Sequence, residues 1–220
     1  MLLYLVRHAE STDNFRRLYS GSGRDVELTE LGQQQALALG AHLSERRVSR
    51  LFVSPMKRTR ATAAPISGAW PEAEVVFSEL LVERHFGSTE GRSVYADIAL
   101  SDAESSGAVT VRVGEFYRSL LLPEFLAEDA PGVVVVVSHG MTIAKLLPVI
   151  LSDFEYTPSV PVAMLPNAGY HMLDIDCTSR KIRSSAFRVN SHLAGVKTAK
   201  ALKGAQFDSS QTRIDSFFKK

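Results

Sequence analysis

The stretch that decides the fold is VVVVVSHG at residues 133–140. Five consecutive β-branched residues favour a strand over a helix. A continuous apolar run without alternation is typical of a strand that is covered on both faces. Two further apolar runs, LLYLV at 2–6 and LFV at 51–53, have the same character. We therefore expect three buried strands in one central sheet.

Helical patterns lie between and after these runs. Thr29 can cap a helix whose inward face carries small and apolar residues at helical spacing: Gly32, Ala36, Leu39 and Leu43. Further helices are expected at 57–66, 109–126 and 141–151, with a polar loop at 101–107 and an alternating hairpin at 169–176 and 181–189. The alternation of strands and helices predicts a three-layer α/β/α fold with a central, mostly parallel sheet.

Length and composition exclude several classes of protein. The 220 residues are 45% hydrophobic and 22% charged, which is ordinary for a globular chain and argues against a wholly disordered one. A net charge of +1 gives no bulk attraction to nucleic acid, so we expect no direct nucleic-acid binding. The single cysteine, Cys177, excludes an internal disulfide and a cysteine-rich zinc site, which suits the reducing cytoplasm. We expect neither a signal peptide nor a membrane span, because no apolar run approaches ~20 residues.

Basic and imidazole side chains follow the three expected strands. Arg7 and His8 end the first strand, Arg58 follows the second, and His139 follows the third. Ligands gather at the carboxyl ends of parallel strands, and a guanidinium presents a fork of donors that matches phosphate oxygens. One such residue alone is more often structural, but the joint arrangement predicts an anion site with phosphate as the natural ligand.

Several ordered blocks carry a family resemblance. RHAESTDN at 7–14 resembles the motif that opens the histidine phosphatase, or phosphoglycerate mutase-like, superfamily. Further blocks of that family follow in order: the segment at 21–36, SPMKRTRATA at 54–63, ERHFG at 83–87 with EG at 90–91, SHG at 138–140, and Asn167 with NSHL at 190–193. The resemblance covers residues 1–195, which we interpret as one catalytic domain with a phosphoglycerate mutase-like fold.

The resemblance implies a catalytic pair. His8 would be the nucleophile that forms a phosphohistidine, so that one difficult displacement becomes two easier ones. Glu83 would protonate the leaving oxygen and then activate water. Neither a metal nor another cofactor is expected, since cationic side chains supply the charge.

The resemblance also implies a shell around the phosphoryl group. Arg7, Arg58 and His139 would hold its non-bridging oxygens and strengthen their grip in the transition state. The remaining pocket residues would be Asn14, Ser20, Gly21 and Gly140. The implied activity is that of a metal-independent phosphatase of the histidine acid type, acting on a small phosphomonoester.

Two other functions remain open on these residues. Cofactor-dependent phosphoglycerate mutases grip a substrate carboxylate with adjacent arginines, whereas residues 91–131 contain only the separated Arg92, Arg112 and Arg118, which favours a phosphatase. A catalytically silent adaptor of the same fold is the third alternative, and the intact set of catalytic residue types argues against it. Leu18 and Ser20 stand where many relatives carry Arg and Gln, so the substrate stays open.

The chain ends in a stretch of different composition. Residues 197–220 hold six basic and two acidic side chains, and we interpret 196–220 as a flexible basic tail. Its last ten residues, QTRIDSFFKK, resemble the PIP box that binds the sliding clamp PCNA, with the defined positions at Gln211, Ile214, Phe217 and Phe218. Spacing of i, i+3 and i+4 puts the apolar members on one face of a helical turn, which suits docking into a groove. Clamp binding implies a nuclear as well as a cytoplasmic location; the alternative is that both phenylalanines pack back on the body.

Overall fold

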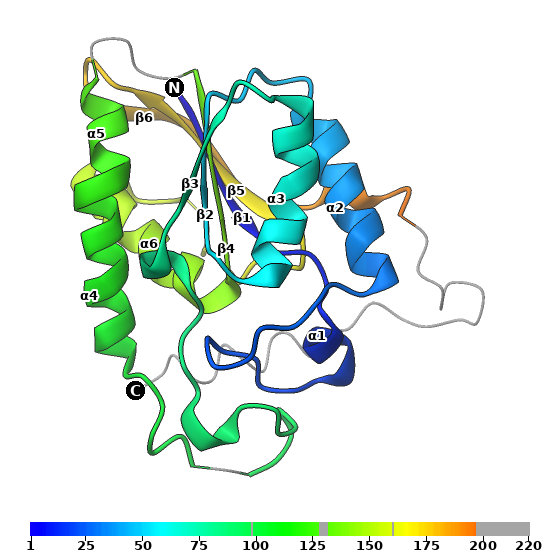
Figure 1. Cartoon of the computed structure of the whole chain (residues 1–220). Helices are drawn as coiled ribbons and strands as arrows, with labels where there is room; N and C mark the ends of the chain where they lie inside the picture. Colours follow the sequence, from blue (N-terminus) through cyan, green and yellow to red (C-terminus); the bar gives the residue numbers. More distant parts are fainter. Residues whose placement is uncertain (98, 128–131, 160, 197–220) are drawn as a thin grey trace.

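The computed structural model describes residues 1–97, 99–127, 132–159 and 161–196, and the PIP-box-like segment lies outside them. Within this part of the chain, six strands form one mixed sheet in the order β3-β2-β4-β1-β5-β6 (Figure 1). The strands are β1 (Leu2–Arg7), β2 (Arg50–Val53), β3 (Glu74–Phe77), β4 (Val133–Ser138), β5 (Tyr170–Asp176) and β6 (Lys181–Val189). The first four strands are parallel to one another, and β5 is antiparallel to both β1 and β6.

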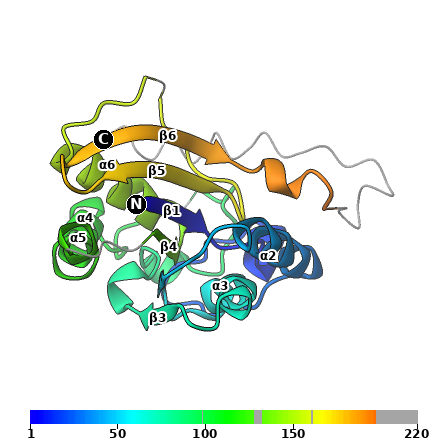
Figure 2. The same cartoon turned by 90° about the horizontal axis from the view of Figure 1, so that it is seen from above.

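Helices cover both faces of the sheet, as Figure 2 shows from above. α2 (Glu30–Leu43) and α3 (Lys57–Ala69) lie on one face, and α4 (Ser106–Phe116), α5 (Leu122–Leu126) and α6 (Gly140–Asp153) lie on the other. The valines of β4 pack against the helices on both faces of the sheet, because successive side chains of a strand point to opposite faces. Val134 and Val136 pack into the core with α4 and α6, whereas the other three pack with α2 and α3. The predicted three-layer architecture is confirmed.

The three apolar runs form the adjacent central strands β1, β4 and β2, and the expected hairpin forms β5 and β6. Thr29 caps α2 as predicted, with its hydroxyl accepting the N–H of Gly32 at 3.0 Å. The sequence pattern does not predict β3. Its four residues are half-buried or exposed at the edge of the sheet, so they show neither a buried run nor a clear alternation.

The expectation of one helix at 109–126 is wrong in detail. α4 begins earlier, at Ser106, where the Ser105 hydroxyl accepts the N–H of Ala108 at 3.0 Å, so the polar loop expected at 101–107 ends at Ser105. After α4 a π-helical segment, η3 (Tyr117–Leu121), leads into α5. Pro123 in the first turn of α5 has no N–H with which to continue the regular ladder, which explains the irregular segment.

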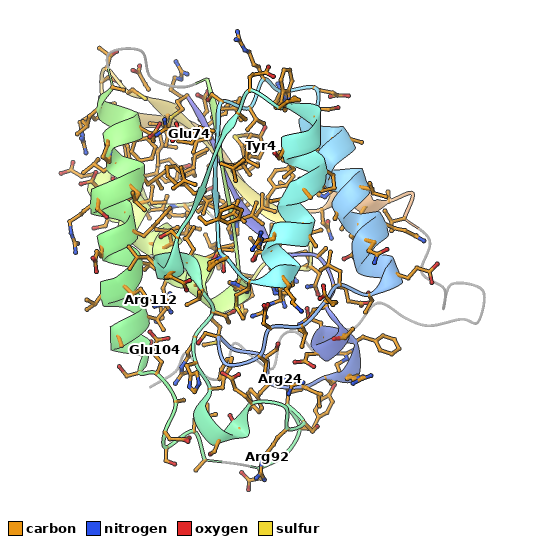
Figure 3. All side chains as sticks on the ribbon, in the orientation of Figure 1. Tyr4, Arg24, Glu74, Arg92, Glu104 and Arg112 are labelled. Atoms are coloured by element: carbon orange, nitrogen blue, oxygen red, sulfur yellow. The ribbon has the colours of Figure 1, made fainter. Side chains whose placement is uncertain are left out.

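The loops after β1, β2 and β4 gather below the sheet in Figure 1. The loop after α1 (Thr12–Arg16) pairs there with the segment after η2 (Gly87–Thr89): the N–H of Tyr19 donates to the Arg92 carbonyl, and the N–H of Gly91 donates to the Tyr19 carbonyl, both at 2.9 Å. Figure 3 places Arg24 and Arg92 at this end of the molecule and Tyr4 and Glu74 at the opposite end. Two loops that are distant in sequence thus lie together at the strand ends.

No helix in the described ranges is long and apolar enough to cross a membrane.

Candidate active site

His8 directly follows β1 and is almost completely buried, with 4% of its surface exposed. Its Nδ1 lies 2.7 Å from the carbonyl oxygen of Ala9. Because a carbonyl can only accept, Nδ1 carries the proton and Nε2 carries the lone pair of a neutral ring. Burial lowers the pKa of His8 well below its usual range, and the charges of Arg58 and Arg7 lower it further. The ring is therefore neutral at pH 7, as an attacking nitrogen requires.

His139 follows β4 and is fully buried beside His8. The centroids of the two imidazole rings are 5.1 Å apart, with 62° between their planes. Arg58 donates from Nε to His139 Nδ1 at 3.2 Å, so Nε2 of His139 donates to the Ser54 hydroxyl at 2.9 Å. Burial, reinforced by the Arg58 guanidinium, lowers the pKa of His139 well below its usual range. Both imidazoles are thus neutral and oriented.

Arg58 lies in the first turn of α3 and has no exposed surface. Besides its bond to His139, it donates to the carbonyl of Arg24 at 2.8 Å and to the carbonyl of Gly21 at 3.1 Å. Burial lowers the pKa of Arg58, and the charge of Glu83 opposes that shift. Gly21 is held close to the next loop: a Cβ there would lie 2.2 Å from a backbone oxygen of residue 84, so no other residue fits without a shift.

Arg7, the last residue of β1, is 7% exposed and donates from Nη1 to the Leu165 carbonyl at 2.7 Å. Burial lowers the pKa of Arg7 to about 10, against the raising effect of Glu83, so the guanidinium stays charged at pH 7. Its Nε is buried and has no partner in the part of the chain that the structure describes. Burying a charged donor without an acceptor costs free energy unless a bound anion accepts its hydrogen bond. Gly140, at the start of α6, lies beside it: a Cβ there would be 3.4 Å from this Nε.

Glu83 is 7% exposed and lies at the amino terminus of α6. Its Oε2 accepts the N–H of Met141 at 3.1 Å, and its Oε1 accepts the N–H of Thr142 at 3.2 Å and the Thr142 hydroxyl at 3.1 Å. The helix end and the nearby guanidiniums of Arg7 and Arg58 both attract its negative charge. The acidic side chain is therefore held next to the cationic cluster by the same helix that His139 precedes.

The remaining pocket residues expected from the sequence lie around α1. Asn14 closes a capping box with Ser11 at the start of that helix. Ser20 is half-buried beside Asp13. Burial raises the pKa of Asp13, but the Arg24 guanidinium, which donates to both carboxylate oxygens, outweighs it and holds that pKa below its usual value. Gln211, Ile214, Phe217 and Phe218, expected to bind a partner, lie outside the described residues.

The sequence reasoning missed the half-buried ion pair between Asp13 and Arg24, whose Nε–Oδ2 distance is 2.7 Å. The pair holds the loop whose Arg24 carbonyl accepts a hydrogen bond from Arg58. No local pattern marks it, because it depends on how that loop folds back over α1. The same reasoning assigned no role to Asn167, which donates to the carbonyl of His8 at 3.1 Å.

The cluster can therefore bind and polarise an anion. It combines two buried guanidiniums, a neutral imidazole with a free lone pair, a second imidazole and a buried carboxyl group. In the described ranges, no three His, Cys, Asp or Glu side chains come together in a way that could hold a metal ion.

Comparison with known proteins agrees with this arrangement. The family description "histidine phosphatase superfamily (branch 1)" matches residues 3–187, and the chain belongs to that superfamily. A probable phosphatase of Schizosaccharomyces pombe is 32% identical over 228 residues, covering 98% of this chain and 79% of the relative. A 2,3-bisphosphoglycerate-dependent phosphoglycerate mutase of Sinorhizobium fredii is 30% identical over 170 residues, covering 67% of this chain and 78% of the relative. The solved structure of mycobacterial hydrolase 1 matches with a TM-score of 0.71 at 23% identity, over 86% of this chain and 99% of that one, which supports the fold.

Proposed function

We propose that this protein is a phosphomonoester hydrolase that works through a phosphohistidine on His8. The observation that carries the proposal is the neutral, buried ring of His8, whose Nε2 lone pair is free while two guanidiniums lie close enough to lower its pKa. Those cations attract a phosphate dianion without protonating the nucleophile. Membership of the histidine phosphatase superfamily and the likeness to a probable phosphatase support the same chemistry.

In the first step, Nε2 of His8 attacks phosphorus and the bond from phosphorus to the ester oxygen breaks. Glu83, which is protonated at the start of the cycle, gives that proton to the ester oxygen and becomes the carboxylate that the helix end and the guanidiniums stabilise, and the product alcohol leaves. Arg7 and Arg58 donate to the non-bridging oxygens, whose charge shifts as the bond order changes. His139 would join them by turning its Nε2–H from the Ser54 hydroxyl to the phosphoryl group. The Nε of Arg7, which has no partner within the described ranges, would donate to such an oxygen.

In the second step, water attacks phosphorus and gives a proton to the Glu83 carboxylate. The bond from phosphorus to nitrogen breaks, inorganic phosphate leaves, and His8 recovers its lone pair. Glu83 then holds the proton for the next cycle, so the reaction consumes only ester and water. We propose that this cycle needs no metal, because Arg7 and Arg58 supply the positive charge at the phosphoryl group.

Phosphoryl transfer between two positions of one substrate is the second candidate, favoured by the likeness to the phosphoglycerate mutase. A mutase must retain and reorient its intermediate, and residues 91–131 lack the adjacent arginines expected to grip a phosphoglycerate carboxylate. We therefore place hydrolysis first, on a small phosphorylated substrate.

Phosphate release from a panel of esters tests the proposal. The panel contains p-nitrophenyl phosphate, sugar phosphates, nucleotides and phosphoglycerates, with a chelator present throughout. We expect release by the wild type and none by His8→Ala. Release that requires added metal, or that survives in His8→Ala, would contradict the mechanism, and isomerisation of phosphoglycerate without release would favour the mutase.

We also propose that the carboxyl-terminal segment docks on the sliding clamp PCNA, which would bring the enzyme into the nucleus as well as the cytoplasm. The support is the sequence alone: Gln211, Ile214, Phe217 and Phe218 occupy every defined position of a PIP box. The double variant Phe217→Ala, Phe218→Ala should lose binding to purified PCNA, whereas Lys219→Ala, Lys220→Ala serves as the matched control. Equal binding by both double variants would end this proposal.

A further inference from the structure

A tight turn joins the site to the last two strands. The N–H of Gly169 donates to the Pro166 carbonyl at 3.0 Å, and Ala168 adopts a left-handed conformation with φ of 53°. The turn lies against the end of β1: the N–H of Ala168 donates to the His8 carbonyl at 3.1 Å, and the N–H of Arg7 donates to the Gly169 carbonyl at 3.0 Å. The main chain of the candidate nucleophile is therefore held by this turn.

Asn167, in the same turn, makes two hydrogen bonds with its side chain. Nδ2 donates to the His8 carbonyl at 3.1 Å and to Oδ1 of Asn14 at 3.0 Å. The orientation of its amide is unambiguous, because a backbone carbonyl accepts only and the atom facing it must be the nitrogen. One side chain thus contacts both the backbone of His8 and a second pocket residue.

The amide of Asn14 is oriented by the same logic. Its Oδ1 accepts from the N–H of Ser11 at 3.2 Å as well as from Asn167, and a backbone N–H can only donate. The oxygen end is therefore committed to the protein. The NH2 end points the opposite way and has no protein partner within the described residues.

We propose that Asn167 is a positioning residue of the phosphate site, an inference that rests on the proposed function. It fixes the Asn14 amide with its nitrogen free to donate to a phosphoryl oxygen, and it holds the backbone from which the His8 ring projects. Without Asn167, the Asn14 oxygen keeps only the two donors of its own helix cap, the Ser11 N–H at 3.2 Å and the Ser11 hydroxyl at 3.0 Å, and nothing from outside the helix holds its amide. The Asn14 amide is then no longer held in its binding orientation before the substrate arrives.

A double-mutant cycle on Asn167 and Asn14 tests this. Asn167→Leu keeps the branched shape, adds no charge and removes both donated bonds. We expect inorganic phosphate to bind about 10-fold more weakly, and kcat/KM for p-nitrophenyl phosphate to fall by about the same factor, as is typical for one hydrogen bond to a charged group. In the Asn14→Ala background the same change should cost clearly less than in the wild type, because Asn167 then has no amide to orient and only its bond to the His8 carbonyl is lost.

The controls separate positioning from folding. Asn190→Leu is the matched control, since Asn190 is exposed and its side chain does not cap the short turn η4 (Ser191–Leu193). Thermal unfolding of all variants reports on stability alone. If Asn167→Leu causes an equally large loss in the wild-type and the Asn14→Ala backgrounds, the inference is overturned, as it is if there is no loss at all.

Calorimetry with phosphate does not depend on turnover, so the two proposals can fail separately. Wild type that binds phosphate and hydrolyses none of the esters would reject the proposed function, while the cycle would still decide the role of Asn167. Wild type that binds no phosphate would reject both.

Discussion

Two pairs of histidine rings lie in contact in this molecule, and they differ in their surroundings. His8 and His139 have centroids 5.1 Å apart at the ends of β1 and β4. His42 and His192 have centroids 5.3 Å apart and are stacked, with 15° between their planes. Ring distance is thus nearly the same in both pairs and carries no information about function.

The neighbours of each pair make the difference. Two buried guanidiniums flank the first pair and leave a charged donor, Arg7 Nε, without a partner in the described ranges. Tyr170 stacks on both rings of the second pair, and His192 donates from Nε2 to the Ala168 carbonyl. The candidate site is therefore marked by buried positive charge that the protein does not itself neutralise. The proximity of two histidine rings does not mark it.

The largest contrast is expected from removing one ring of each pair. His8→Ala removes the nucleophile, and phosphate release should fall by more than ~1000-fold. His192→Ala should change kcat/KM by less than about 3-fold. Steady-state rates with p-nitrophenyl phosphate measure both. Comparable losses in the two variants would erase the distinction drawn between the pairs.

Arg58→Lys should produce the next largest effect, a loss of about 100-fold in kcat/KM, because an ammonium cannot reproduce the planar fork that bonds several acceptors at once. Arg60→Lys is the matched control, since Arg60 lies on the same helix but is exposed. If the Arg58→Lys variant supports near-normal rates, the buried guanidinium is structural and the site needs only its charge.

The stacked pair should matter for stability instead. His192→Ala removes the ring contacts with Tyr170 and His42 and one hydrogen bond to the Ala168 carbonyl. We expect the free energy of unfolding to fall by about 1 kcal/mol, measured by urea denaturation at pH 7. An unchanged unfolding midpoint would show that the stack contributes nothing to the fold.

A buried histidine outside both pairs, His171, should make the stability of the protein depend on pH. Burial lowers the pKa of His171 to about 4. The unfolded chain takes up that proton near pH 6.5 and the folded chain does not, so stability falls as the pH drops below about 6.5. Between pH 7 and pH 5 this residue alone should lower the free energy of unfolding by about 2 kcal/mol. His171→Gln should reduce the acid loss by that amount; the same loss in the variant would show that the pKa of His171 is not depressed.

The central strands and the residues that follow them could be predicted from the sequence. Unbroken runs of apolar residues identify β1, β2 and β4, and parallel strands bring their carboxyl ends together, so the convergence of His8, Arg58 and His139 follows from topology. Glu83 could be singled out only through the family resemblance, because no periodic pattern surrounds it, and its place at the start of α6 came from the structure.

Other features depend on long-range packing that no local pattern records. The Asp13–Arg24 pair and the two bonds of Asn167 join segments that approach each other only in the folded chain. The edge strand β3 likewise results from tertiary packing, because its half-buried and exposed residues carry no clear pattern. The sequence therefore predicts the three central strands and the convergence of the side chains that follow them, whereas the edge strand and the contacts between distant segments depend on the folded chain.

Direct detection of the phosphoenzyme tests the central claim. Wild type mixed with p-nitrophenyl phosphate in a chelator is quenched in base, where phosphohistidine survives, and the intact mass and its peptides are measured. We predict one phosphoryl group per chain, located on His8 and missing from His8→Ala. A phosphoryl group on another residue, or full turnover with no phosphoenzyme at any time point, would contradict the account.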